Sequence, residues 1–113
     1  MKALFVELPA FERYRELYMD DVSFRAFQAE LIKNPAAGDV IAGTGGLRKI
    51  RFGDRRRAKG KRGGLRIIYY WWLSGQQFWL FTLYDKDEMD DLGVKERQTL
   101  VELLRRETQA RTQ

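Results

Sequence analysis

Hydrophobic and polar positions change their spacing along the chain, and each spacing predicts a different element. Residues 3–7 form a short apolar run of strand formers. Aromatic residues then recur at helical intervals, which predicts an amphipathic helix over about residues 10–18. A second helix can be capped by Asp20 or Asp21 and ends at Asn34-Pro35, because the residue before a proline avoids helical angles. We expect the two helices to form a hairpin whose aromatic faces pack on a sheet.

The second half of the chain returns to strand spacing. Residues 47–52 alternate, so Ile50 and Phe52 share one face of a strand while Lys49 and Arg51 share the other. Two denser runs follow and are joined by a turn. They are apolar on both faces, which predicts central strands covered by helices. Their bounds are residues 65–73 and 78–84, with the turn at residues 74–77.

One helix completes the predicted fold. Gly93 can serve as its N-cap, and apolar positions continue at helical spacing to Leu104. From about Glu107 to the end, residues 107–113, the sequence is polar and predicts a frayed tail. The order β-α-α-β-β-β-α therefore predicts one α+β domain over residues 1–113: an antiparallel sheet, an N-terminal helical hairpin packed on it and a C-terminal helix.

Composition restricts the chemistry of this domain. The chain has no cysteine and no histidine, which excludes a Cys/His zinc site and a nucleophile activated by histidine. No apolar run approaches the roughly 20 residues of a membrane span, and the N-terminal segment does not resemble a signal peptide. We expect a soluble, cytoplasmic protein that needs no cofactor and contacts no membrane.

Charge is concentrated in one stretch. Residues 48–66 hold ten Lys or Arg and one acid, a net +9, whereas the whole chain carries only +5. The rest of the protein is therefore acidic, at −4. Such asymmetry in a small domain is typical of a polyanion-binding surface, although a charge run alone is more often a solvated loop.

Two other motifs carry weaker signals. The glycine-rich segment 43–46 lacks the Gly-Lys-Ser/Thr ending of a phosphate loop and no strand-to-helix context follows, so a nucleotide site of that kind is rejected. A group of acids follows the last predicted strand; a solvated turn before the final helix is favoured over a metal site. Its members are Asp85, Asp87, Glu88, Asp90 and Asp91.

The basic stretch offers a chemistry for cutting RNA. Cleavage requires the 2′-hydroxyl to lose a proton, the leaving 5′-oxygen to gain one, and charge on the phosphoryl oxygens to be stabilised. Arg51 and Arg66 stay protonated at ordinary pH, so they are candidates to bind the scissile phosphate and stabilise its transition-state charge. Lys49 is a candidate general base, if neighbouring cations and partial burial depress its pKa. Tyr84 and Lys86, at the end of the last strand, are both candidate proton donors.

Three segments together resemble the RelE/ParE toxin superfamily, and specifically its HigB branch. They are residues 45–51, residues 59–70 and residues 83–92. The resemblance implies the toxin of a type II toxin–antitoxin pair, which enters the ribosomal A site and cuts mRNA there without a metal. It also implies an antitoxin partner, usually one with a helix-turn-helix DNA-binding domain.

The same resemblance implies roles for individual residues. Lys49 and Arg51 match the basic pair on the family's second strand, and Arg66 matches the arginine before the apolar strand. RelE itself has an arginine after its last strand and a tyrosine near its C-terminus, whereas this chain has an acidic segment around Lys86 and no tyrosine beyond Tyr84. The implied RNA contacts are Arg48, Lys61 and Arg62, and the implied contacts to ribosomal RNA phosphates are Arg55, Arg56, Arg57 and Lys59.

Two alternatives stay open at this point. A ParE-like inhibitor of DNA gyrase would share the fold without needing the basic cluster for catalysis. A non-catalytic nucleic-acid-binding module would use the same cluster only for phosphate contacts. Trp71, Trp72 and Trp79 are most simply core or sheet-face residues, and base stacking by one of them is the less favoured interpretation.

Overall fold

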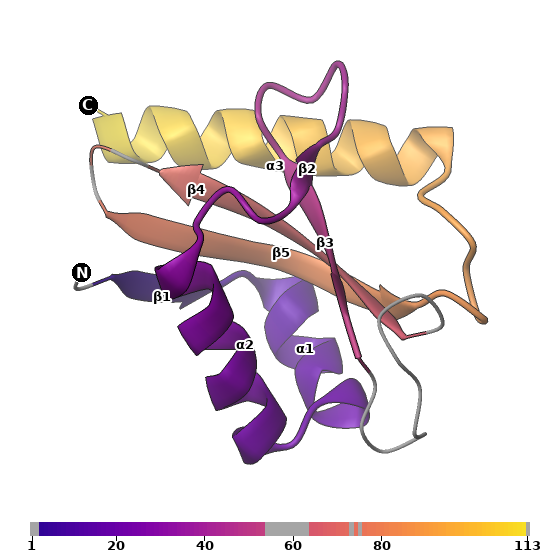
Figure 1. The fold of residues 1–113 in the computed structure, drawn as a ribbon. Coiled ribbons are helices and arrows are strands. Elements are labelled where there is room, and N and C mark those ends of the chain that lie inside the picture. Colours follow the sequence, from indigo (N-terminus) through magenta and orange to yellow (C-terminus); the bar gives the residue numbers. More distant parts are fainter. Residues whose placement is uncertain (1–2, 54–63, 73, 75, 113) are drawn as a thin grey trace.

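The protein is an α+β domain in which a sheet lies between two helical layers (Figure 1). The computed structural model describes residues 3–53, 64–72, 74 and 76–112. The elements are β1 (Leu4–Glu7), α1 (Pro9–Tyr18), α2 (Asp21–Lys33), β2 (Asp39–Val40), β3 (Arg48–Phe52), β4 (Leu65–Trp72), β5 (Gln77–Asp85) and α3 (Val94–Thr112). The predicted fold class is confirmed, with one short strand more than expected.

The sheet has five strands in the order β1-β5-β4-β3-β2. Neighbouring strands from β2 to β5 are antiparallel, as predicted, whereas β1 runs parallel to β5. After β1 the chain passes through the helical hairpin and returns to the sheet at β2, the opposite edge strand. Strand β1 is therefore an edge strand that pairs with β5, the last strand in the sequence. Strands β4 and β5 are the central pair, which explains why both of their faces are apolar.

Two hydrophobic cores lie on opposite faces of the sheet. Helices α1 and α2 cover one face, and Phe11, Phe27 and Leu31 are fully buried there. Helix α3 crosses the other face, where Leu100 and Leu104 pack into a second core (Figure 1). We call this second face the α3 face. Each amphipathic helix removes its apolar stripe from water, which is the main favourable contribution to the fold.

The three tryptophans belong to these cores. Trp79 is fully buried on the α3 face, and its ring centroid lies 5.3 Å from that of Trp72. Trp71 is partly buried against the other core and stacks on Phe78. Their prediction as core or sheet-face residues is confirmed.

Local signals position the helix ends. The backbone N–H of Ser23 donates to Asp20 Oδ1 over 2.7 Å, so Asp20 is the cap of α2. Gly93 precedes α3 and accepts a hydrogen bond from the Arg97 N–H at its carbonyl. A Cβ at Gly93 would lie 2.6 Å from Glu96 Oε2, because that carboxylate folds back over the helix start.

Two boundaries differ from the prediction. Residues 39–40, where no strand was predicted, pair with Lys49 and Arg48 as a short edge strand. Residues 107–112 were expected as a frayed polar tail, but they continue α3. Arg111 explains the extension, because its guanidinium lies 4.8 Å from the Trp79 ring centroid and pairs with Glu107.

Candidate nucleic-acid interface

Three predicted site residues form one row across the sheet. Arg51 of β3 pairs in register with Arg66 of β4, and Arg66 pairs with Tyr84 of β5. Side chains at directly paired positions lie on the same face. Because Tyr84 belongs to the core under α3, the row lies on the α3 face, at the end of the sheet where β3 and β5 stop.

Lys49 extends this row along β3. It lies two positions before Arg51, pairs in register with Ile68, and therefore shares the face of Arg51. The alternation predicted from the sequence is thus realised, and the sheet brings Lys49, Arg51, Arg66 and Tyr84 together. We call these four residues the cationic row.

Members of the cationic row differ in their exposure to solvent. Arg51 is exposed, whereas Arg66 is only 4% exposed and donates from Nη1 to the Leu65 carbonyl over 3.3 Å. A buried guanidinium is costly unless its donors are satisfied, so Arg66 is fixed by its surroundings. Arg51 is the member that most readily meets a ligand from solvent.

Asp91 contributes a carboxylate next to the cationic row. From the sequence, Asp91 was only one of five acids in the turn before the final helix. Lys49 Nζ donates to Asp91 Oδ1 over 3.2 Å, and the Leu92 N–H donates to the same oxygen over 2.8 Å. The Leu92 hydrogen bond, and then Lys49, lower the pKa of Asp91 below its usual value. The cations expected beside Lys49 are therefore accompanied by an ionised carboxylate. No local pattern distinguishes Asp91 from its acidic neighbours.

Tyr84 is suited to donating a proton. Its side chain is 5% exposed, and burial together with the Asp91 carboxylate raises the pKa of Tyr84 to about 12, while Arg66 acts in the opposite direction. The hydroxyl has no well-formed hydrogen bond to any described residue. At neutral pH the group is therefore a neutral phenol that can donate a hydrogen bond or a proton, but cannot act as a base.

Two other predicted residues have structural contacts. Arg48 Nη1 donates to the carbonyls of Gly38 at 2.8 Å and Ala36 at 3.4 Å, so its guanidinium holds the loop before β2. Lys86 follows β5, and its backbone N–H donates to the Gly64 carbonyl over 3.2 Å. These contacts leave the predicted roles of Arg48 in RNA binding and of Lys86 in proton donation as predictions.

The other predicted contacts to RNA involve residues outside the described part of the chain. Six basic residues of the stretch lie outside the described part of the chain: Arg55, Arg56, Arg57, Lys59, Lys61 and Arg62. The described residues on either side, Gly53 and Gly64, adjoin the ends of β3 and β4. The predicted RNA-binding roles of the six basic residues therefore stay predictions.

A polar hollow of about 440 Å³ lies beside the open edge of β3. Strand β2 pairs only with Arg48 and Lys49, so the edge beyond Ile50 is not covered by β2. Lys49 and Arg51 form part of the wall. The other lining residues are Glu30, Asn34, Ala37, Asp39 and Ile50. Cationic and hydrogen-bonding groups therefore meet at this edge.

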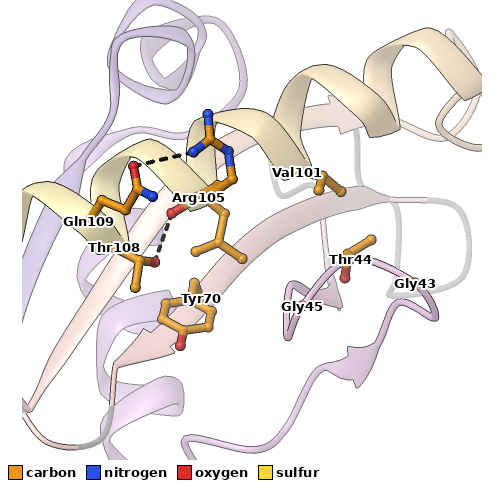
Figure 2. Close-up of a pocket in the computed structure, with 9 residues that line it drawn as sticks. Gly43, Thr44, Gly45, Tyr70, Val101, Arg105, Thr108 and Gln109 are labelled. Carbon is orange, nitrogen blue, oxygen red and sulfur yellow. Dashed lines mark hydrogen bonds between the residues drawn. The ribbon is translucent and has the colours of Figure 1, made fainter.

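The glycine-rich segment has a structural use. Thr44 Oγ1 donates to the Ile41 carbonyl over 2.6 Å and accepts from the Leu47 N–H over 3.2 Å. Gly43 and Gly45 have φ of 76° and 80°, angles that favour glycine. The resulting loop faces Arg105 and Gln109 of α3 across a pocket of about 410 Å³ (Figure 2). The Thr44 hydroxyl thus forms hydrogen bonds within its own loop, and this use does not require a phosphate.

The acids at the end of β5 and after it also build local structure. Asp85 Oδ1 accepts from the Asp87 N–H, and Glu88 accepts from the Tyr18 hydroxyl. Within the described residues, no three Asp or Glu side chains converge as a metal site would require. None of the helices in that part of the chain is both long and apolar enough to cross a bilayer.

Comparison with known proteins supports the architecture. No family model matches the sequence. Among solved structures, a double arginine-to-alanine mutant of the E. coli toxin RelE in the free state superposes with a TM-score of 0.51. Identity is 12%, and the match covers 80% of this chain and 90% of RelE. With its sheet order and helical layers, the chain therefore has the RelE toxin fold.

Proposed function

We propose that this protein is the toxin of a type II toxin–antitoxin pair, of the HigB kind, and that it cleaves mRNA in the ribosomal A site. The observation that carries the proposal is the register Arg51–Arg66–Tyr84, with Lys49 on the same face. The RelE-like fold supports it. The HigB assignment rests on the three sequence segments that resemble that branch.

In this mechanism Arg51 binds the scissile phosphate from solvent, and Arg66, which is only 4% exposed, adds positive charge at the paired position. The Arg51 guanidinium presents paired N–H donors that match phosphoryl oxygens, and both arginines remain charged throughout the reaction. The 2′-oxygen attacks phosphorus while the bond to the 5′-oxygen breaks, leaving a cyclic phosphate and a 5′-hydroxyl. Negative charge grows on the phosphoryl oxygens during this step, so preorganised cations lower the barrier.

Proton transfers complete the reaction. Tyr84 is the preferred donor to the leaving 5′-oxygen, because it pairs in register with Arg66 and its phenol carries a proton at neutral pH. Lys86 is the second candidate donor. The 2′-hydroxyl proton passes to Lys49 or to solvent; in the first case the Lys49 ammonium must first leave Asp91 and lose its proton. A site of this composition gains greatly from a substrate that the ribosome has already arranged.

The proposal includes two partners. The ribosome with bound mRNA presents the substrate, and Arg55, Arg56, Arg57 and Lys59 bind ribosomal RNA phosphates, while Arg48, Lys61 and Arg62 contact the message. A cognate antitoxin, of the type with a helix-turn-helix domain, neutralises the toxin in the cytoplasm. No metal or cofactor enters the reaction.

Induced expression followed by primer extension on cellular mRNA tests this function. We expect cuts within translated codons that disappear when translation is blocked. Arg51→Ala should remove the cuts, whereas Arg13→Ala, an exposed arginine on α1, should retain them. Intact transcripts in growth-arrested cells would contradict the proposal. In that case, toxicity that survives Arg51→Ala would indicate a gyrase inhibitor, and graded loss across all basic residues would indicate a binding module.

A further inference from the structure

We propose that Asp91 is a positioning residue of the site: it holds the Lys49 ammonium on the face of β3 that carries Arg51, so that Lys49 contributes charge to the phosphate. This inference rests on the proposed function. Its first support is the direct contact between Lys49 Nζ and Asp91 Oδ1 at 3.2 Å, which joins residues 42 positions apart.

The carboxylate is itself held in place. Asp91 Oδ1 accepts the Leu92 backbone N–H over 2.8 Å. Leu92 is only 9% exposed and packs in the core of the α3 face. The Asp91 side chain is 55% exposed, so this backbone hydrogen bond, and not burial, restrains its orientation. Asp91 can therefore orient Lys49.

Three side chains from different parts of the chain interact electrostatically with this carboxylate. Lys49 belongs to β3, Tyr84 to β5 and Arg97 to the start of α3. Asp91 lowers the acidity of Tyr84, and Lys49 and Arg97 both favour the ionised form of Asp91. Asp91 thus interacts with both the proposed phosphate-binding cation and the preferred proton donor.

The two possible roles of Lys49 respond oppositely to loss of this carboxylate. If Lys49 acts as a cation, Asp91→Asn removes the ion pair that positions its ammonium, and cleavage becomes slower. If Lys49 acts as a general base, it must be neutral, and removal of the neighbouring anion makes the neutral form easier to reach. The direction of the change therefore identifies the role.

The test measures kcat and KM for mRNA cleavage on programmed ribosomes. Asp91→Asn should lower kcat about 10- to 100-fold, the scale that small displacements of a reacting group produce. Asp90→Asn is the matched control, since it removes the same charge from the adjacent exposed position. Relative to that control KM should change little, and Asp91→Glu should restore part of kcat. A kcat equal to or above that of Asp90→Asn would overturn the proposal.

A second measurement does not depend on cleavage. Acylation of Lys49 by an amine-reactive reagent, quantified by mass spectrometry with Lys86 as internal reference, reports whether Asp91 holds the ammonium. We expect Asp91→Asn to raise the Lys49 rate about two- to fivefold, the range that a partly exposed ion pair allows. Unchanged acylation would also overturn the proposal. A third outcome separates the two proposals. If wild type does not cleave mRNA but Asp91→Asn still raises the rate of Lys49 acylation, the proposed function is refuted, while the role of Asp91 in holding Lys49 is retained.

Discussion

Arg51 and Arg66 occupy directly opposite positions on neighbouring strands, so two guanidinium groups share one end of the sheet. Like charges placed opposite each other destabilise a pair of strands. An anion bound between them removes that repulsion. We therefore expect the pairing to oppose folding slightly and to favour binding of a phosphate, as in sites where stability and function conflict.

Replacing one arginine should separate stability from activity. We expect Arg51→Gln to raise the free energy of unfolding by up to about 0.5 kcal/mol, because the opposing charge is relieved, and to abolish most mRNA cleavage. Urea denaturation and primer extension measure the two effects. Arg13→Gln is the control for loss of one positive charge at an exposed position. A clear loss of stability specific to Arg51→Gln would contradict this explanation.

Tyr84→Phe should preserve the fold and impair the chemistry. Phenylalanine keeps the buried ring, and the hydroxyl it lacks makes no well-formed hydrogen bond to a described residue. The free energy of unfolding should therefore stay the same or rise slightly, since no established hydrogen bond is broken. Cleavage should fall about 10²-fold or more if Tyr84 donates the proton. Full activity in this variant would transfer the donor role to Lys86.

The raised pKa of Tyr84 predicts a pH dependence of stability. Folding favours the protonated phenol, because the pKa rises from 10.0 to about 12 in the folded chain. The resulting stabilisation is present below pH 10 and is lost as pH rises through about 12. Wild type should therefore lose stability relative to Tyr84→Phe over this range, since the variant has no phenol to ionise. The wild-type-minus-variant absorbance at 295 nm should show one tyrosinate forming near pH 12, and a midpoint near 10 would refute the burial argument.

Tyr69→Phe should destabilise the loop beside the polar hollow. The buried Tyr69 hydroxyl accepts from the Gly38 N–H and donates to the Pro35 carbonyl, both at 2.9 Å. Its removal leaves both backbone groups without that partner, at a cost of about 1–3 kcal/mol. Thermal denaturation measures the loss. Tyr14→Phe, on an exposed part of α1, should change stability far less; equal losses would show that the buried hydroxyl has no special role.

The local elements and the parity of the basic pair were predictable from the sequence. Spacing of apolar residues identified both helical layers and the central strands. Alternation placed Lys49 and Arg51 on one face, because side-chain direction along a strand repeats every two residues. These features depend on neighbours in the chain, so a local pattern contains them.

Only the tertiary structure decided how distant segments meet. The register that opposes Arg51 and Arg66, the contact of Lys49 with Asp91, and the packing of Arg111 on Trp79 all join residues far apart in sequence. The last of these contacts stabilises a helix end that its polar composition alone predicted to fray. Strand register and side-chain contacts of this kind are fixed by simultaneous packing of both sheet faces, so no local pattern of residues specifies them.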